Sequence, residues 1–114
     1  MERASDRIVA GAAVELVACD AAGRVISLRR LGAVDRLRLF KAIGAELAEN
    51  PPYLGMAMLA VSVTAIDNVP VPAPATEAQV EALVHRLGDG GILAIAEALD
   101  RADAEGTEFS EPGN

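Results

Sequence analysis

Residues 53–66 read Tyr-Leu-Gly-Met-Ala-Met-Leu-Ala-Val-Ser-Val-Thr-Ala-Ile and form a strongly apolar stretch at the centre of the chain. Asn50 can cap a helix that begins here, and Pro51 suits its first turn, where a missing N–H breaks no hydrogen bond. We therefore predict a helix from Tyr53 to about Ile66. Such a helix spans about 21 Å, short of the roughly 30 Å core of a bilayer. Because it is apolar on nearly every side, we expect it to be buried by the rest of the domain or by a second protein.

A second helix is predicted before this stretch, from about Ala33 to Glu49. Asp35 lies in its first turn, where a negative charge suits the helix dipole. Its apolar residues recur at spacings of three and four, which predicts one buried face made of Val34, Leu37, Phe40, Ile43 and Leu47.

The N-terminal part favours two β-strands, at about residues 8–18 and 24–29, because apolar and polar residues alternate there. Residues 20–23, Asp-Ala-Ala-Gly, suit the turn between them. We predict a β-hairpin, with one amphipathic helix that begins at Ser5 as the alternative. The segment Leu16-Val17-Ala18-Cys19 also resembles a bacterial lipidation box, but Glu15 interrupts the apolar run that a signal peptide requires.

Residues 69–74 contain three prolines and predict an extended connector. Thr76 and Gln79 form a capping box for a third helix, which Gly88 ends. Asp89 can cap a fourth helix. Residues 1–103 are therefore expected to form a single globular domain, followed by a disordered acidic tail at 104–114. The predicted fold class is α+β and mainly α, with an N-terminal β-hairpin followed by about four helices.

The composition excludes several classes of function. The 114 residues allow one domain, and the small number of aromatic residues predicts an aliphatic core. A net charge of −7 argues against nucleic acid. Cys19 is the only cysteine, which favours a reducing cytoplasm and packing as a small apolar residue. Basic residues concentrate in one region, where we expect salt bridges with acids of this chain or of a partner: Arg24, Arg29, Arg30, Arg36, Arg38 and Lys41.

The residues that could carry chemistry do not form a convincing site. His85 is the only histidine, and Glu81 lies one turn before it, as expected of a solvated helix face. Residues 88–91, Gly-Asp-Gly-Gly, lack the Lys and Ser or Thr of a phosphate-binding loop. We predict no catalytic residue, no metal site and no cofactor, and therefore no enzyme.

Three segments together resemble a known family: residues 37–44 (Leu-Arg-Leu-Phe-Lys-Ala-Ile-Gly), residues 53–67 and residues 76–88. Their order resembles that of the tail assembly chaperones of bacteriophages, prophages and gene transfer agents. In it an Arg-rich segment leads into a helix. A very apolar helix follows and ends in a short motif similar to Val63-Thr64-Ala65-Ile66-Asp67. A connector that contains prolines comes next. The likeness covers roughly residues 24–100.

The resemblance implies a protein of the bacterial host cytoplasm that binds the tape measure protein, keeps it soluble and recruits tail tube subunits. It implies no catalytic residues. The alternative is a small cytoplasmic adaptor or regulatory protein-binding module, and a homo-oligomer is a further option. Met side chains adapt to varied partners and Tyr is a good anchor at interfaces. The candidate partner-binding residues are therefore Tyr53, Leu54, Met56, Met58 and Leu59. The alternative role of each is packing in the core.

Overall fold

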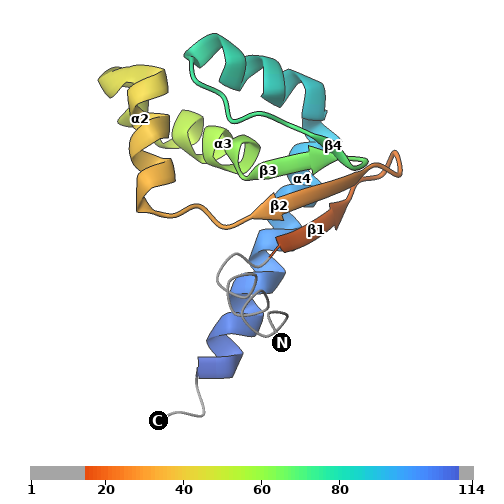
Figure 1. Cartoon of the computed structure of the whole chain (residues 1–114). Helices are drawn as coiled ribbons and strands as arrows, with labels where there is room; N and C mark the ends of the chain where they lie inside the picture. The colour runs from red at the N-terminus through yellow and green to blue at the C-terminus, as the bar shows by residue number, and fades with distance from the viewer. Residues whose placement is uncertain (1–14, 111–114) are drawn as a thin grey trace, which may run out of the picture.

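The computed structural model describes residues 15–110, with side chains from 16 to 104, as a four-stranded antiparallel sheet packed against helices (Figure 1). The chain is α+β and mainly α, and the predicted fold class is confirmed. The strand order is β1-β2-β3-β4. The elements are β1 (Glu15–Cys19), β2 (Val25–Arg29), α2 (Ala33–Ala48), α3 (Pro51–Val61), β3 (Val63–Ile66), β4 (Val69–Pro70) and α4 (Glu77–Ser110).

The predicted N-terminal hairpin is confirmed over the described residues. β1 and β2 pair in register from Glu15 opposite Arg29 to Cys19 opposite Val25. Between them, the Asp20 carboxylate accepts hydrogen bonds from the backbone N–H groups of Ala22 and Arg24 at 3.0 and 2.9 Å. These bonds replace water around a tight turn and fix the register of the pair. Residues 8–14 of the predicted first strand, and the start of a helix at Ser5, lie outside the described residues.

The helix predicted from Tyr53 to Ile66 is wrong in its second half. α3 ends at Val61, and Val63–Ile66 forms β3, which pairs with β2. The buried Ser62 ends the helix, because its hydroxyl donates to the Leu59 carbonyl at 2.6 Å while its own carbonyl accepts from Arg29 N–H. The apolar run thus splits between a helix and an internal strand, so its burial does not by itself require a second protein.

A tight turn and an edge strand follow β3. Asp67 and Asn68 both have positive φ, as the two central residues of a two-residue hairpin turn require. Val69 and Pro70 then pair with β3 as the short edge strand β4, where a proline is tolerated because its missing N–H faces no neighbour. The predicted extended connector therefore begins as part of the sheet.

α4 consists of two helical parts. Gly88 has φ +71° and ψ 177°, so the helix that begins at Glu77 is interrupted there, where the sequence predicts a stop. Thr76 Oγ1 accepts from Gln79 N–H, and the Gln79 side chain accepts from Ala75 N–H. The second part is assigned as helix to Ser110, past the predicted start of the tail at 104, and residues 111–114 lie outside the described range.

The core has two clusters, and α3 contributes to both. The larger one joins the inner face of the sheet to both parts of α4 and includes Ile26, Leu28, Leu87 and Ile95. The smaller one lies between α2, α3 and the first part of α4 and consists of Leu39, Ile43, Ala57 and Val80. The buried apolar residues are all Ala, Val, Leu or Ile, as the composition predicts. Figure 1 shows α2 at the end of the molecule away from the turn between β1 and β2.

Candidate functional site

The five candidate residues of α3 do not share one surface. Tyr53 and Met56 line a cavity of about 210 Å³ against the first part of α4. Met58 and Leu59 line a different cavity, of about 340 Å³, against the end of β2 and the start of α2. Leu54 is half-buried and packs against the smaller core cluster. Met56 is the most open, at 47% exposed. The candidates therefore divide between two sides of one helix.

Tyr53 connects α3 to the first part of α4. Its hydroxyl donates a 2.8 Å hydrogen bond to Glu81 Oε2. Burial raises the pKa of Tyr53 to about 12, and the hydrogen bond and negative charge of Glu81 contribute in the same direction. Glu81 is thus engaged with Tyr53, while His85, one turn further on, is exposed. Tyr53 acts as an internal tie between two helices, with its donor already used.

The largest difference from the sequence-based prediction concerns α2. Leu39 and Ile43 are its buried residues, whereas Val34, Leu37 and Phe40 are 58%, 65% and 36% exposed. We call the surface formed by these last three residues the α2 apolar face. Apolar residues at i, i+3 and i+6 follow one side of a helix, so the face is continuous over two turns.

This outcome has a local cause. Before Gly44, α2 carries two apolar stripes. Val34, Leu37 and Phe40 lie on one, and Leu39 and Ile43, spaced by four, lie on the other and pack with Ala57 of α3. Gly44 has φ +88° and interrupts the helix, so the stripe predicted from Val34 to Leu47 does not continue across it. The buried side therefore follows Leu39 and Ile43, and the α2 apolar face points away from the core.

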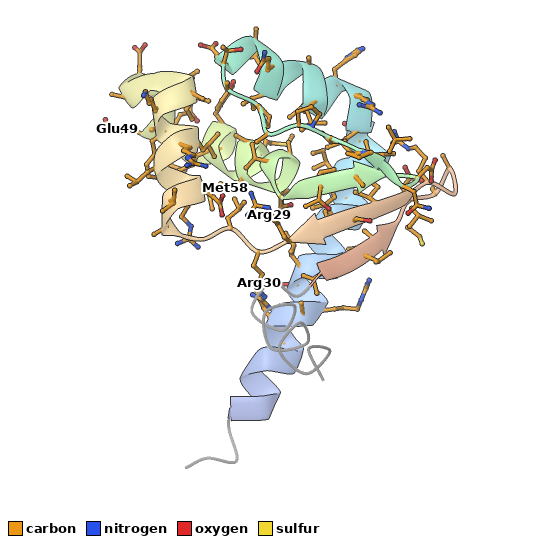
Figure 2. All side chains as sticks on the ribbon, in the orientation of Figure 1. Arg29, Arg30, Glu49 and Met58 are labelled. Carbon is orange, nitrogen blue, oxygen red and sulfur yellow. The ribbon has the colours of Figure 1, made fainter. Side chains whose placement is uncertain are left out.

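A groove of about 340 Å³ adjoins the start of α2. Its apolar lining comes from Leu31, Met58, Leu59 and Leu99, which belong to three separate segments. Its basic lining comes from Arg29, Arg30 and Arg36. We call it the basic groove. Figure 2 labels Arg29, Arg30 and Met58, which come from β2, the β2–α2 connection and α3; Arg29 and Met58 lie near each other in this view, and Arg30 extends towards α4.

Two of these arginines are already paired. Arg29 donates two hydrogen bonds to the Asp35 carboxylate, at 2.8 and 3.0 Å. The hydrogen bond from Arg29, followed by that from Gly32 N–H, lowers the pKa of Asp35 to about 2. Arg30 pairs with Asp103 of α4 at 2.6 Å. No acidic partner of Arg36 lies within ion-pair distance among the residues that the structure describes.

Arg24 has a structural role at the other end of β2. It pairs with Asp20 at 2.7 Å and donates to the carbonyls of Arg86 and Leu87, at 3.0 and 2.7 Å. These carbonyls end the first part of α4 and lack helical partners because of the break at Gly88. The pairs of Arg24, Arg29 and Arg30 confirm the prediction that the basic region forms salt bridges within the chain.

Cys19 is exposed on β1, so the prediction that it packs as an apolar residue is wrong. Its strand neighbour Ala18 takes the inward position instead, because successive residues of a strand face opposite sides. Within residues 15–110, no three His, Cys, Asp or Glu side chains are grouped so that they could hold a metal ion. In the same range, no helix has both the length and the apolar character needed to cross a membrane.

Comparisons with protein-family models, with curated proteins and with solved structures find no match for this chain.

Proposed function

We propose that this chain is a bacteriophage tail assembly chaperone of the host cytoplasm that binds helical segments of the tape measure protein through the α2 apolar face. It acts by binding and not by catalysis. The observation that carries the proposal is the exposure of Val34, Leu37 and Phe40 on a helix whose opposite side is held in the core. The order of sequence elements supplies the identity of the partner.

The α2 apolar face suits an apolar helix as its ligand. Covering a fully exposed Val, Leu or Phe side chain stabilises a complex by about 1.5–3 kcal/mol, and these three are only partly exposed. Association and ordering costs offset part of that gain. A contact of this size is modest, which suits a chaperone that tail tube subunits must later displace. A long tape measure helix offers many such contacts in sequence.

The helix that carries the face is held in place by contacts with the rest of the domain, which lowers the cost of binding. Leu39 and Ile43 fix α2 from below, and the Arg29–Asp35 pair fixes its first turn. A helix whose backbone is already held in place loses little further backbone freedom when a partner covers it. The contacts that hold α2 in place therefore lie on the opposite side of the helix from the proposed contact and in its first turn.

Co-expression with the tape measure protein of the same gene cluster tests the proposal. The wild-type chain is expected to give a soluble complex, and Leu37→Ser to lower the soluble fraction severalfold. Leu93→Ser is the matched control, because Leu93 is 59% exposed but lies on α4. Circular dichroism of both variants checks that the fold is intact.

An insoluble tape measure protein that does not co-purify with the wild-type chain would contradict the proposal. A tight one-to-one complex with the product of a neighbouring toxin or enzyme gene would favour the adaptor alternative. Equal loss in Leu37→Ser and Leu93→Ser would show that the α2 apolar face is not the contact.

A further inference from the structure

The positive charge of this acidic chain is concentrated in one segment. Residues 24–41 hold six of the ten Lys and Arg residues but only one of the seventeen acids, Asp35. Outside this segment acidic residues predominate. A basic region on an acidic protein is a distinct electrostatic feature, which attracts a partner of opposite charge to one place.

Three of these basic residues converge on the basic groove, and their charge is not fully neutralised. The charge of Arg29 is neutralised by Asp35, to which it donates two hydrogen bonds. The Arg30–Asp103 pair is open to water, since the two side chains are 55% and 64% exposed. An exposed pair of this kind contributes little, so a competing carboxylate can replace Asp103. Arg36 has no acidic partner within the described part of the chain.

The basic groove and the α2 apolar face are neighbours. Arg36 lines the groove, and Phe40 follows it by four residues on α2. Residues four apart lie on the same side of a helix, within about 6 Å of each other. A single partner helix can therefore cover Phe40 and reach Arg36 at once.

We infer that the basic groove receives an acidic amphipathic helix of the partner protein. An apolar side chain of that helix contacts Met58, Leu59 and Leu99, while its carboxylates pair with Arg30 and Arg36. The planar guanidinium suits a carboxylate, because two parallel hydrogen bonds can form. This inference rests on the proposed function, since the helix belongs to the same partner that covers the α2 apolar face.

The test uses the full-length chain and two synthetic helical peptides as probes. The peptides share one apolar face and differ only at the flanking positions, which are Glu in one peptide and Lys in the other. Isothermal titration at low salt is expected to show the Glu peptide binding at least about tenfold more tightly. This advantage is expected to shrink as salt rises, because exposed charges are screened.

Two charge reversals locate the contact. Arg36→Glu is expected to weaken binding of the Glu peptide about fivefold or more, since an attractive contact becomes repulsive. Arg101→Glu is the matched control, because Arg101 is exposed and its reversal changes the net charge equally. Arg101 is two residues from both Leu99 and Asp103 of α4, so it lies on another side of that helix from the groove. It is expected to leave binding almost unchanged.

The outcomes separate this inference from the proposed function. Equal binding of both peptides, or tighter binding of the Lys peptide, would overturn the acidic preference while helix binding itself stands. An equal effect of Arg36→Glu and Arg101→Glu would overturn the groove as the contact. Binding of neither peptide would overturn the groove as a helix site, while a soluble complex with the tape measure protein would leave the proposed function standing. Dimerisation that Arg36→Glu abolishes, or a preference for duplex DNA over the Glu peptide, would assign the groove to another occupant and overturn the inference.

Discussion

Arg29 at the end of β2 holds Asp35 in the first turn of α2 through two hydrogen bonds, of 2.8 and 3.0 Å. Asp35 also accepts a 2.8 Å hydrogen bond from Gly32 N–H, which would otherwise lack a partner at the start of the helix. One carboxylate thus connects the sheet, the connecting loop and α2. It sets the direction in which α2 leaves the sheet, and with it the positions of the α2 apolar face and of Arg36.

Removal of the Asp35 charge is expected to destabilise the fold. Asp35→Asn keeps the shape of the side chain but removes the charge and leaves only one oxygen that can accept from Arg29, so one of the two hydrogen bonds is lost. Because Arg29 is more than a third exposed, water screens the pair, and we expect the free energy of unfolding to fall by about 1 kcal/mol. Urea denaturation measures this change. Asp100→Asn, at an exposed position of α4, is the control and should change little; equal losses in both variants would contradict the account.

The same pair predicts a dependence of stability on acid pH. The pKa of Asp35 is about 2 in the folded chain and 3.8 ordinarily. A lowered pKa stabilises the folded state above about pH 4 and loses that effect as pH falls towards about 2. The difference in unfolding free energy between wild type and Asp35→Asn should therefore be constant above about pH 4 and shrink below it. A difference that persists unchanged at about pH 2 would argue against the pair.

Tyr53 predicts the opposite dependence at alkaline pH. The pKa of Tyr53 is about 12, against an ordinary 10.0, so the folded state favours the neutral phenol. Its contribution is fully present below about pH 10 and is lost as pH rises through about 12. Because Tyr53 is the only tyrosine and the chain has no tryptophan, tyrosinate absorbance reports it alone.

We expect a midpoint near 12 in the folded chain and near 10 in denaturant. Glu81→Gln should lower the folded midpoint, since the negative charge beside the phenol is removed while burial remains. A folded midpoint near 10 would show that Tyr53 is open to water and does not tie α3 to α4.

Two adjacent glycines of α4 should respond differently to alanine. A Cβ at Gly91 would lie 3.1 Å from Leu87 Cβ and 3.2 Å from Arg24 Nη2, whereas one at Gly90 meets nothing within 4 Å. Gly91→Ala therefore displaces the guanidinium that holds the Leu87 carbonyl. Gly90→Ala gains helix propensity without a clash.

We expect thermal or urea unfolding to place Gly91→Ala about 1–2 kcal/mol below Gly90→Ala in stability. The two substitutions share the same chemistry and neighbouring positions, so the difference isolates the contact with Arg24 and Leu87. Equal stability of the two variants would show that the hairpin does not hold the break at Gly88.

Several parts of the fold follow from local sequence signals. The Asp20–Gly23 turn, the N-cap at Asn50 and the stop at Gly88 depend on residues within a few positions, and each lies where predicted. β3 could not be found in this way. Its helix-like apolar run becomes a strand because β2 offers a partner far away in sequence, and the β-branched Val63, Thr64 and Ile66 suit that pairing.

The proposed contact surface was harder to predict than the fold. Apolar periodicity shows that a helix has an apolar stripe but does not say which of two stripes is buried. In α2 both stripes fit, and only the packing of Leu39 and Ile43 on α3 decides that Val34 and Leu37 stay exposed. The concentration of arginines was visible in the sequence. Its convergence on a groove required the fold, because Met58 and Leu99 come from distant segments.

Hydrogen–deuterium exchange on the complex with the tape measure protein shows whether the α2 apolar face is the surface that binds it. Backbone exchange is compared residue by residue between the free chain and the complex. We expect exchange to slow at residues 33–43, which carry the α2 apolar face, while residues 77–87 of α4 are unchanged. Unchanged exchange at residues 33–43, with slowing confined to the first part of α4, would contradict this expectation.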